Sequence, residues 1–191
     1  MRRIVVTEFI SVDGVMEGPG GEPGYKHSGW VGKFHGPESI EYKLDEVKTH
    51  DALLLGRKTY EGFAAAWPER DGEFADRMNA MQKYVVSTTL DPGLEWENSE
   101  LISENVPEEI AKLKEGEGGD ILVGGSRTLV QTLKEHDLVD EYRLMTFPIV
   151  LGSGARLFGE SDDATTLKLT DAKPVDSGTV ILTYEPAYAA A

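Results

Sequence analysis

Two glycine turns in the sequence carry the residue types that bind phosphate. Each follows a short apolar run of strand length, at residues 52–55 and 121–123, and each precedes apolar residues at helical spacing. The turn residues are Gly56, Arg57, Lys58 and Thr59 in one case and Gly124, Gly125, Ser126, Arg127 and Thr128 in the other. A helix that begins at such a turn leaves backbone N–H groups free, and these favour an anion. The turns therefore predict phosphate binding, with an ordinary strand-to-helix connection as the alternative.

Three further segments follow predicted strands and could contact a ligand. They are Ser11–Gly14, Ser87–Thr89 and Pro148–Gly152. In open α/β sheets, ligands lie past the carboxyl ends of parallel strands. We therefore expect most of these segments to share one rim with the two glycine turns.

The connection over residues 15–36 is long and rich in glycine. It also contains the aromatic residues Tyr25, Trp30 and Phe34. Connections of this length are uncommon unless they serve as lids or binding loops. The segment therefore predicts a binding role, and a floppy surface loop is the alternative.

The composition excludes several classes of partner. With 34 acidic and 19 basic residues the formal net charge is −15, whereas nucleic acids and anionic membranes need a basic face. The chain has no cysteine, which excludes disulfides, thiolate metal sites and a cysteine nucleophile. The four histidines lack metal-site spacing, and no apolar run reaches the roughly 18 residues of a membrane span. We expect a cytoplasmic protein with no metal and with neither nucleic acid nor membrane as partner.

Strands and helices alternate through most of the chain. Strands are predicted over about 3–10, 52–55, 83–87, 100–103, 121–123 and 141–150, and helices over about 37–48, 56–66, 73–81, 106–115 and 126–133. Residues 166–173 and 179–184 alternate apolar and polar side chains around a turn, which predicts an antiparallel hairpin. This order favours a mainly parallel α/β sheet with helices on both faces and an antiparallel edge.

At these positions the sequence resembles the dihydrofolate reductase superfamily. The motifs are Gly56-Arg57-Lys58-Thr59-Tyr60, Ser87-Thr88, Gly124-Gly125-Ser126 and Pro148–Gly152. The Ser11–Gly14 opening and the Leu151–Phe158 stretch are most similar to the RibD C-terminal domain family, the reductase domain of the bifunctional riboflavin-biosynthesis enzyme. The resemblance implies a dihydrofolate-reductase-like three-layer α/β/α fold in a single domain over residues 1–186. We expect residues 187–191 to form a disordered tail.

The resemblance also implies NADPH as hydride donor, and a homodimer. Carried over by position, Gly56–Thr59 would hold the adenosine 2′-phosphate and the pyrophosphate, and Ser87 and Thr88 would contact the 2′-phosphate region. Gly124–Thr128 would cradle the pyrophosphate and let the nicotinamide lie flat against the backbone. The residue types agree in part with a 2′-phosphate. A free 2′-hydroxyl is usually bound by a carboxylate, whereas the cations Arg57 and Lys58 stand at that position in this sequence.

On the substrate side, the resemblance makes Asp13 the polar group nearest the nicotinamide and the candidate catalytic residue. A capping or turn aspartate is the alternative. Hydride transfer to a C=N or C=O bond also needs a proton source, for which Asp13, a carboxylate of the first helix and an ordered water are candidates. Pro148 and Leu151 would form a wall under the substrate ring, and Trp30 or Tyr25 would cover it.

Several features separate this chain from related enzymes. Folate reducers bind the pterin through one carboxylate of the first helix, a position for which Glu38, Glu41 and Asp45 compete here. The zinc deaminase motif of the bifunctional enzyme is absent. A phosphosugar substrate would need more basic residues, and Arg156 is the one clear candidate.

These observations predict an NADPH-dependent reductase of a small heterocycle related to pteridines, pyrimidines or flavins. Dihydrofolate reductase proper is one alternative. A nucleotide- or flavin-binding module without catalysis is another, and a purely structural dimer is the third.

Overall fold

The computed structural model describes residues 1–159 and 164–187. The chain divides into two compact units, which we call the first unit (Met1–Val6 and Lys43–Val139) and the second unit (Thr7–Tyr42 and Asp140–Ala191). Neither unit is a continuous stretch of chain. The tail that we expect to be disordered lies, from residue 188 onward, outside the described residues.

One eight-stranded sheet runs through the described residues in the order β4-β3-β2-β5-β1-β6-β8-β7. The strands are β1 Ile4–Ser11, β2 Ala52–Gly56, β3 Gln82–Val86, β4 Ser99–Ile102, β5 Ile121–Gly124, β6 Glu141–Phe147, β7 Leu167–Pro174 and β8 Val180–Pro186. β2 pairs in parallel with β3 and β5, and β3 with β4. β8 is antiparallel to both β6 and β7. The prediction of a mostly parallel sheet with an antiparallel C-terminal edge is confirmed.

Five α-helices connect or flank these strands in the described chain. They are α1 Pro37–Thr49, α2 Arg57–Ala66, α3 Glu73–Ala80, α4 Val106–Glu115 and α5 Arg127–Glu135. Each lies within a few residues of its predicted range. Among the described helices, none is long and apolar enough to cross a bilayer.

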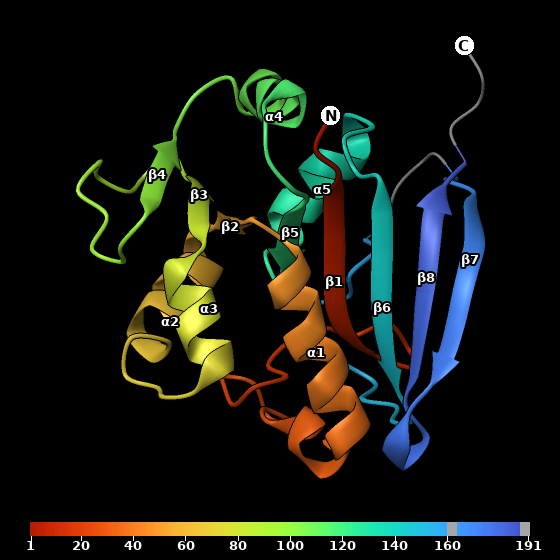
Figure 1. Ribbon diagram of the computed structural model, residues 1–191. Helices are drawn as coiled ribbons and strands as arrows, with labels where there is room; N and C mark the ends of the chain where they lie inside the picture. Colours follow the sequence, from red (N-terminus) through yellow and green to blue (C-terminus); the bar gives the residue numbers. More distant parts are fainter. Residues whose placement is uncertain (160–163, 188–191) are drawn as a thin grey trace. The chain divides into compact units, whose positions relative to one another are not determined.

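The central strands of the first unit, β2 and β5, are buried on both faces. Leu53 and Leu55 of β2 pack with Tyr60 of α2 in one apolar cluster. Successive strand residues point to opposite faces, so Ala52 and Leu54, which are also buried, face the other side. Such continuously apolar strands are typical of parallel sheets covered by helices. Figure 1 shows α2 and α3 together beside β2 and β3.

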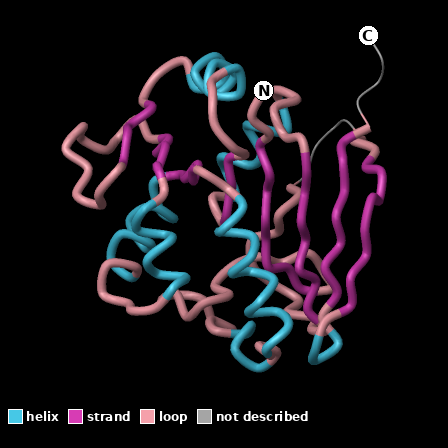
Figure 2. Tube along the Cα trace, in the orientation of Figure 1, coloured by secondary structure: helices cyan, strands magenta, loops and turns pink. Residues whose placement is uncertain are grey.

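The second unit has its own core beneath the glycine-rich connection. Val15, Trp30 and Val31 pack there with Phe147 of β6 and Ile181 of β8. A short 3-10 helix, η1 (Trp30–Lys33), was not predicted from the sequence, because one turn carries no periodic pattern. β7 and β8 lie side by side and are joined by the helical turn η2 (Asp176–Gly178) (Figure 2).

The start of α1 is fixed by a residue far along the chain. Asp176 in η2 accepts a hydrogen bond from the backbone N–H of Glu38 at 3.0 Å. A Cβ atom on Gly36 would lie only 1.9 Å from the Asp176 carboxylate, so the close approach needs glycine at that position. The carboxylate therefore satisfies one of the free N–H groups at this helix N-terminus.

Lys83 of β3 is a fully buried cation without a carboxylate acceptor among its hydrogen bonds. Its ammonium donates to the carbonyl oxygens of Asn79 at 2.5 Å and Glu97 at 2.9 Å. It also lies 4.3 Å from the centroid of the Trp96 ring. Burial disfavours the charged form and lowers the pKa of Lys83 to about 8.

This burial predicts a pH dependence of stability. Between pH 8 and 10.5, the ordinary lysine value, the unfolded chain binds more protons than the folded chain, so the free energy of unfolding rises with pH. The rise from this group is about 3 kcal/mol. We expect Lys83→Met to remove it, so that wild type gains stability relative to the variant from pH 8 to 10. Urea unfolding followed by tryptophan fluorescence measures the difference, and parallel pH curves would contradict the assignment.

Candidate functional site

Three of the predicted ligand-binding segments lie along one edge of the first unit. In the β2–β3 pair Gly56 is opposite Val86, so Arg57 and Ser87 leave neighbouring strands at the same level. The parallel β2–β5 pair brings Gly124 to the same edge. The structure thus gathers residues 56–59, 87–89 and 124–128, as the sequence predicts.

Two helices begin at this edge with features that favour an anion. α2 follows β2 directly, and α5 begins two residues after β5 ends. Neither N-cap residue, Gly56 of α2 or Ser126 of α5, makes a capping hydrogen bond through its own side chain. The first turns of α1, α3 and α4 carry acidic residues, whereas those of α2 and α5 carry none. Although the chain has a net charge of −15, no acidic residue in the first turn of α2 or α5 neutralises the positive end of the helix dipole.

The two helix ends are locked together by a pair of hydroxyl groups. The Thr59 hydroxyl accepts the backbone N–H of Ser126, and the Ser126 hydroxyl accepts the backbone N–H of Gly56, each at 2.9 Å. A Cβ atom on Gly125 would lie 3.0 Å from the Thr59 hydroxyl, and Gly125 has a φ of +64°. Glycine is therefore needed where the two turns meet.

This lock corrects one prediction and refines another. Ser126 stands at the N-cap position of α5, but its hydroxyl binds Gly56 instead of capping the helix. The hydroxyl oxygens of Thr59 and Ser126 therefore accept hydrogen bonds from the protein's own backbone. A phosphate at this edge would meet mainly backbone N–H groups, together with the hydrogen of the Thr59 hydroxyl. The sequence does not predict these two hydrogen bonds, because the residues that they join are 67 and 70 positions apart.

Arg57 lies across the end of β3. Its Nη1 donates to the Thr89 hydroxyl at 2.6 Å, and its Nε donates to Glu61 at 2.8 Å. The hydroxyl of Ser87, itself buried, accepts the backbone N–H groups of Thr89 and Leu90 at 3.1 Å. Ser87 therefore shapes the turn, and Thr89 makes the contact with Arg57.

The two remaining residues predicted to bind the 2′-phosphate end are accessible. Lys58 and Thr88 are both exposed to solvent at this edge of the first unit. The ammonium of Lys58 and the hydroxyl of Thr88 are therefore available as donors to an anionic ligand.

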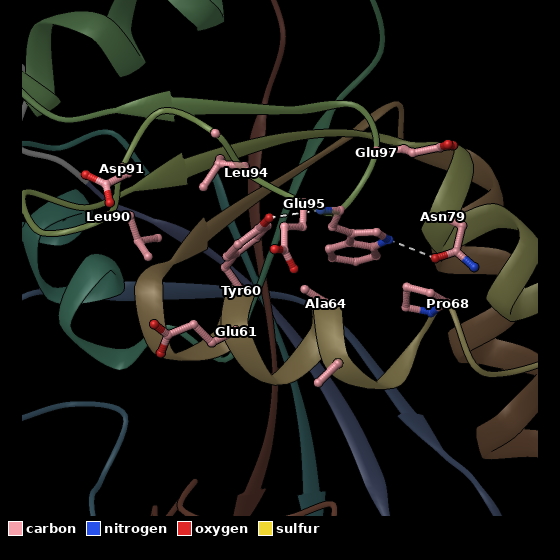
Figure 3. Close-up of a pocket in the computed structure, with 13 residues that line it drawn as sticks. Tyr60, Glu61, Ala64, Pro68, Asn79, Leu90, Asp91, Leu94, Glu95 and Glu97 are labelled. Carbon is pink, nitrogen blue, oxygen red and sulfur yellow. Dashed lines mark hydrogen bonds between the residues drawn. The ribbon is translucent and has the colours of Figure 1, made fainter.

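A cavity of about 850 Å³ lies along another side of α2 (Figure 3). Tyr60, Ala64 and Trp96 are among its lining residues. Its carboxylates are Glu61, Asp91, Glu95 and Glu97, and no lysine or arginine among the described residues lines it. The cavity is therefore unsuited to a phosphate, in contrast to the helix ends described above.

In the second unit, Asp13 is held by donors from two segments. Its carboxylate accepts the Ser11 hydroxyl at 2.6 Å and the backbone N–H groups of Leu151 at 3.1 Å and Gly152 at 2.8 Å. The Ser11 hydroxyl, together with the two N–H groups, lowers the pKa of Asp13 to about 2. Asp13 is thus ionised near neutral pH, so its carboxylate carries no proton to donate there.

Arg156 completes this anchor. Its Nε donates to the backbone carbonyl of Asp13 at 2.9 Å, and its Nη2 lies 3.8 Å from the Asp13 carboxylate. The side chain considered for a phosphosugar is therefore engaged with the backbone and charge of Asp13.

The glycine-rich connection is tied down, which corrects the role predicted for Trp30. The indole is buried at 3% exposure, donates to the carbonyl of Glu17 at 2.9 Å and packs edge-on against Phe147. Trp30 belongs to the core and does not cover a substrate. Tyr25 is also engaged, since its hydroxyl donates to the carbonyl of Ser153 at 2.6 Å.

The apolar surface beside Asp13 differs in part from the prediction. Pro148 is exposed, as expected, but the side chain of Leu151 is buried in the core. Val12 and Val150 are instead the exposed apolar side chains, at 63% and 69%. No periodic pattern in the sequence marks these two residues, because Val12 follows the end of β1 and Val150 follows the end of β6.

No group of three acidic or histidine side chains in the described residues is arranged to hold a metal ion.

Three comparisons with known proteins bear on these features. The model of the RibD C-terminal domain matches residues 2–181. The uncharacterized protein YyaP of Bacillus subtilis (strain 168) is 30% identical over 189 residues, covering 96% of this chain and 94% of that protein.

Two solved structures share the fold. A putative riboflavin biosynthesis protein from Shewanella sp. PV-4 has a TM-score of 0.75 at 22% identity, covering 97% of this chain and 99% of that chain. A dihydrofolate reductase from Enterococcus faecalis, complexed with NADP(H) and RAB-propyl, has a TM-score of 0.65 at 19% identity and covers 97% of each chain. The predicted dihydrofolate-reductase-like fold is confirmed.

The hydroxyl lock predicts a stability effect that depends on a single oxygen. Thr59→Val keeps the side-chain shape but leaves the Ser126 N–H without its acceptor, which costs about 1–3 kcal/mol. Thr59→Ser restores the oxygen, so we expect it to recover most of the loss. Urea unfolding of the three proteins measures the effect. Equal stability of Thr59→Val and Thr59→Ser would contradict the lock.

Asp13 predicts a second stability effect, at low pH. Asp13→Asn removes the charge and turns an amide toward a backbone N–H, at a cost of about 1–3 kcal/mol at pH 7. Because the folded pKa is lowered to about 2 from 3.8, the wild-type advantage is present above pH 4 and lost as the pH falls toward 2. Unfolding free energies of both proteins from pH 2 to 7 test this, and an advantage that persists at pH 2 would contradict it.

Proposed function

Because the chain belongs to the RibD C-terminal domain family, we propose that it is an NADPH-dependent reductase of a small, flat heterocycle. The observation that carries the proposal is the pair of α2 and α5 N-termini at one sheet edge, free of acidic first-turn residues and beside Arg57. A pyrophosphate there would accept backbone N–H groups from both helices. Gly125 allows close approach of the ligand to the backbone.

The 2′-phosphate is assigned to the cations at the start of α2. Arg57 is half exposed, at 47%, and Lys58 is exposed beside it. Guanidinium and ammonium groups match a phosphate, whereas a free ribose hydroxyl is usually met by a carboxylate. The NADP(H) complex of the structurally similar dihydrofolate reductase supports NADPH as the cofactor.

Bound NADPH would supply the hydride, and the chain's own residues would orient the acceptor. A carboxylate can accept about four hydrogen bonds, and three donors fill three of these sites on Asp13. The remaining site can accept an N–H group of a heterocycle. The ionised carboxylate would also favour protonation of a ring nitrogen, and a protonated C=N bond accepts a hydride more readily. The accompanying proton is then assigned to water, and the exposed Val12, Pro148 and Val150 offer apolar surface to a ring.

The cofactor assignment predicts a strong preference for NADPH over NADH. We expect wild type to bind NADPH at least about tenfold more tightly, and Arg57→Ala to lose most of that preference without a change in NADH affinity, because a charge-assisted hydrogen bond contributes about 1.5–3 kcal/mol. Nicotinamide fluorescence titrations of both proteins measure this. If wild type bound neither nucleotide, the proposal would be overturned.

Turnover separates the reductase from its alternatives. With NADPH bound, dihydrofolate and oxidised pteridines, pyrimidines and flavins are offered in turn, and loss of absorbance at 340 nm is followed. Dihydrofolate turnover would identify a folate reductase, whereas tight NADPH binding without turnover of any compound would favour a binding module. The homodimer stays a prediction, for which sedimentation is the measurement.

A further inference from the structure

Arg57 is held by two anchors of different chemistry. One is the carboxylate of Glu61, one helical turn along α2, which accepts from Nε. The other is the hydroxyl of Thr89, which follows β3 and accepts from Nη1. A guanidinium has five N–H donors in a planar fork, and these bonds engage it at two adjacent nitrogens.

The second anchor is itself fixed. Ser87 is buried, and its hydroxyl accepts the backbone N–H groups of Thr89 and Leu90. The Thr89 hydroxyl also lies 3.3 Å from that of Ser87. The guanidinium is therefore fixed between a helix and a turn whose backbone is set by a buried side chain.

This arrangement leaves part of the fork for a ligand. Arg57 is 47% exposed, and its Nη2 has no partner in the part of the chain that the structure describes. If the arginine side chain were mobile in the free protein, its ordering on binding would weaken the affinity, because an immobilised arginine loses much rotamer freedom. Here the folded protein has already ordered it.

We propose that Glu61, together with Thr89, is a positioning residue that presets Arg57 and so determines the preference of this site for a 2′-phosphorylated dinucleotide. The inference rests on the proposed function of the α2 and α5 helix ends. It assigns Glu61 a role distinct from that of an exposed helical ion pair, which contributes little to stability.

The charge of Glu61 makes the proposal discriminating. A carboxylate near a phosphate repels it, so electrostatics alone predicts that removing Glu61 tightens NADPH binding. Loss of positioning predicts the opposite. The direction of the change therefore separates the two effects.

The experiment compares the NADPH and NADH affinities of Glu61→Ala, Glu61→Gln and Thr89→Val with those of wild type, by nicotinamide fluorescence. We expect Glu61→Ala to weaken NADPH binding about three- to tenfold and to leave NADH within about twofold. Glu61→Gln keeps an acceptor at the same reach and removes the charge, so it should retain or exceed wild-type NADPH affinity. Thr89→Val should weaken NADPH binding about twofold or more, again without an effect on NADH.

A double-mutant cycle and a matched control complete the test. In an Arg57→Ala background, Glu61→Ala should have no further effect on the NADPH to NADH ratio, because nothing is left to position. Glu109→Ala removes a carboxylate from an exposed ion pair with Lys112 on α4, and it should leave both affinities unchanged.

The outcomes distinguish this inference from the proposed function. If wild type prefers NADPH and Glu61→Ala binds it equally or more tightly, the positioning role is wrong and the cofactor assignment stands. If Glu61→Ala weakens NADPH and NADH alike, Glu61 supports only the local fold, which also overturns the inference. If wild type binds neither nucleotide, the proposed function itself fails.

Discussion

Parallel pairing of β2 with β3 on one side and β5 on the other is the constraint on which the first unit depends. Because carboxyl ends of parallel strands lie at the same edge, this pairing gathers three loop starts that are far apart in the sequence. The hydroxyls of Thr59 and Ser126 then fix the two helix ends relative to each other. The register of the strands thus gathers the backbone N–H donors of two helix starts at one edge of the sheet.

Electrostatics makes this edge an exception in an acidic protein. The chain carries 34 acidic and 19 basic residues, yet the first turns of α2 and α5 contain no carboxylate. The nearby cavity along α2 is lined by carboxylates and no basic side chain. An anion is therefore favoured at one end of α2 and disfavoured along its side. Glu61 belongs to both environments, since it lines the cavity and holds Arg57.

The second unit is organised around a carboxylate, that of Asp13, whereas the first unit presents backbone N–H donors at the starts of α2 and α5. Asp13 collects a hydroxyl and two backbone N–H groups, and so ties the end of β1 to the segment after β6. The same bonds that make it an anchor keep it ionised, which removes it as a proton donor and leaves it as a fixed acceptor. The hydrogen bonds that anchor Asp13 are therefore the same ones that set its charge.

The sequence by itself determined the order and type of the strands and α-helices, the class of sheet and the segments that meet at the carboxyl edge of β2, β3 and β5. These follow from periodicity, glycine turns and the geometry of parallel strands, all of which are local or general. Only the tertiary structure decided that Trp30 is core, that Ser126 binds Gly56, and that Glu61 and Thr89 hold Arg57. Such contacts depend on side-chain directions and on distances between segments remote in sequence. A residue type states which bonds a side chain can make, and the packed fold selects the partner.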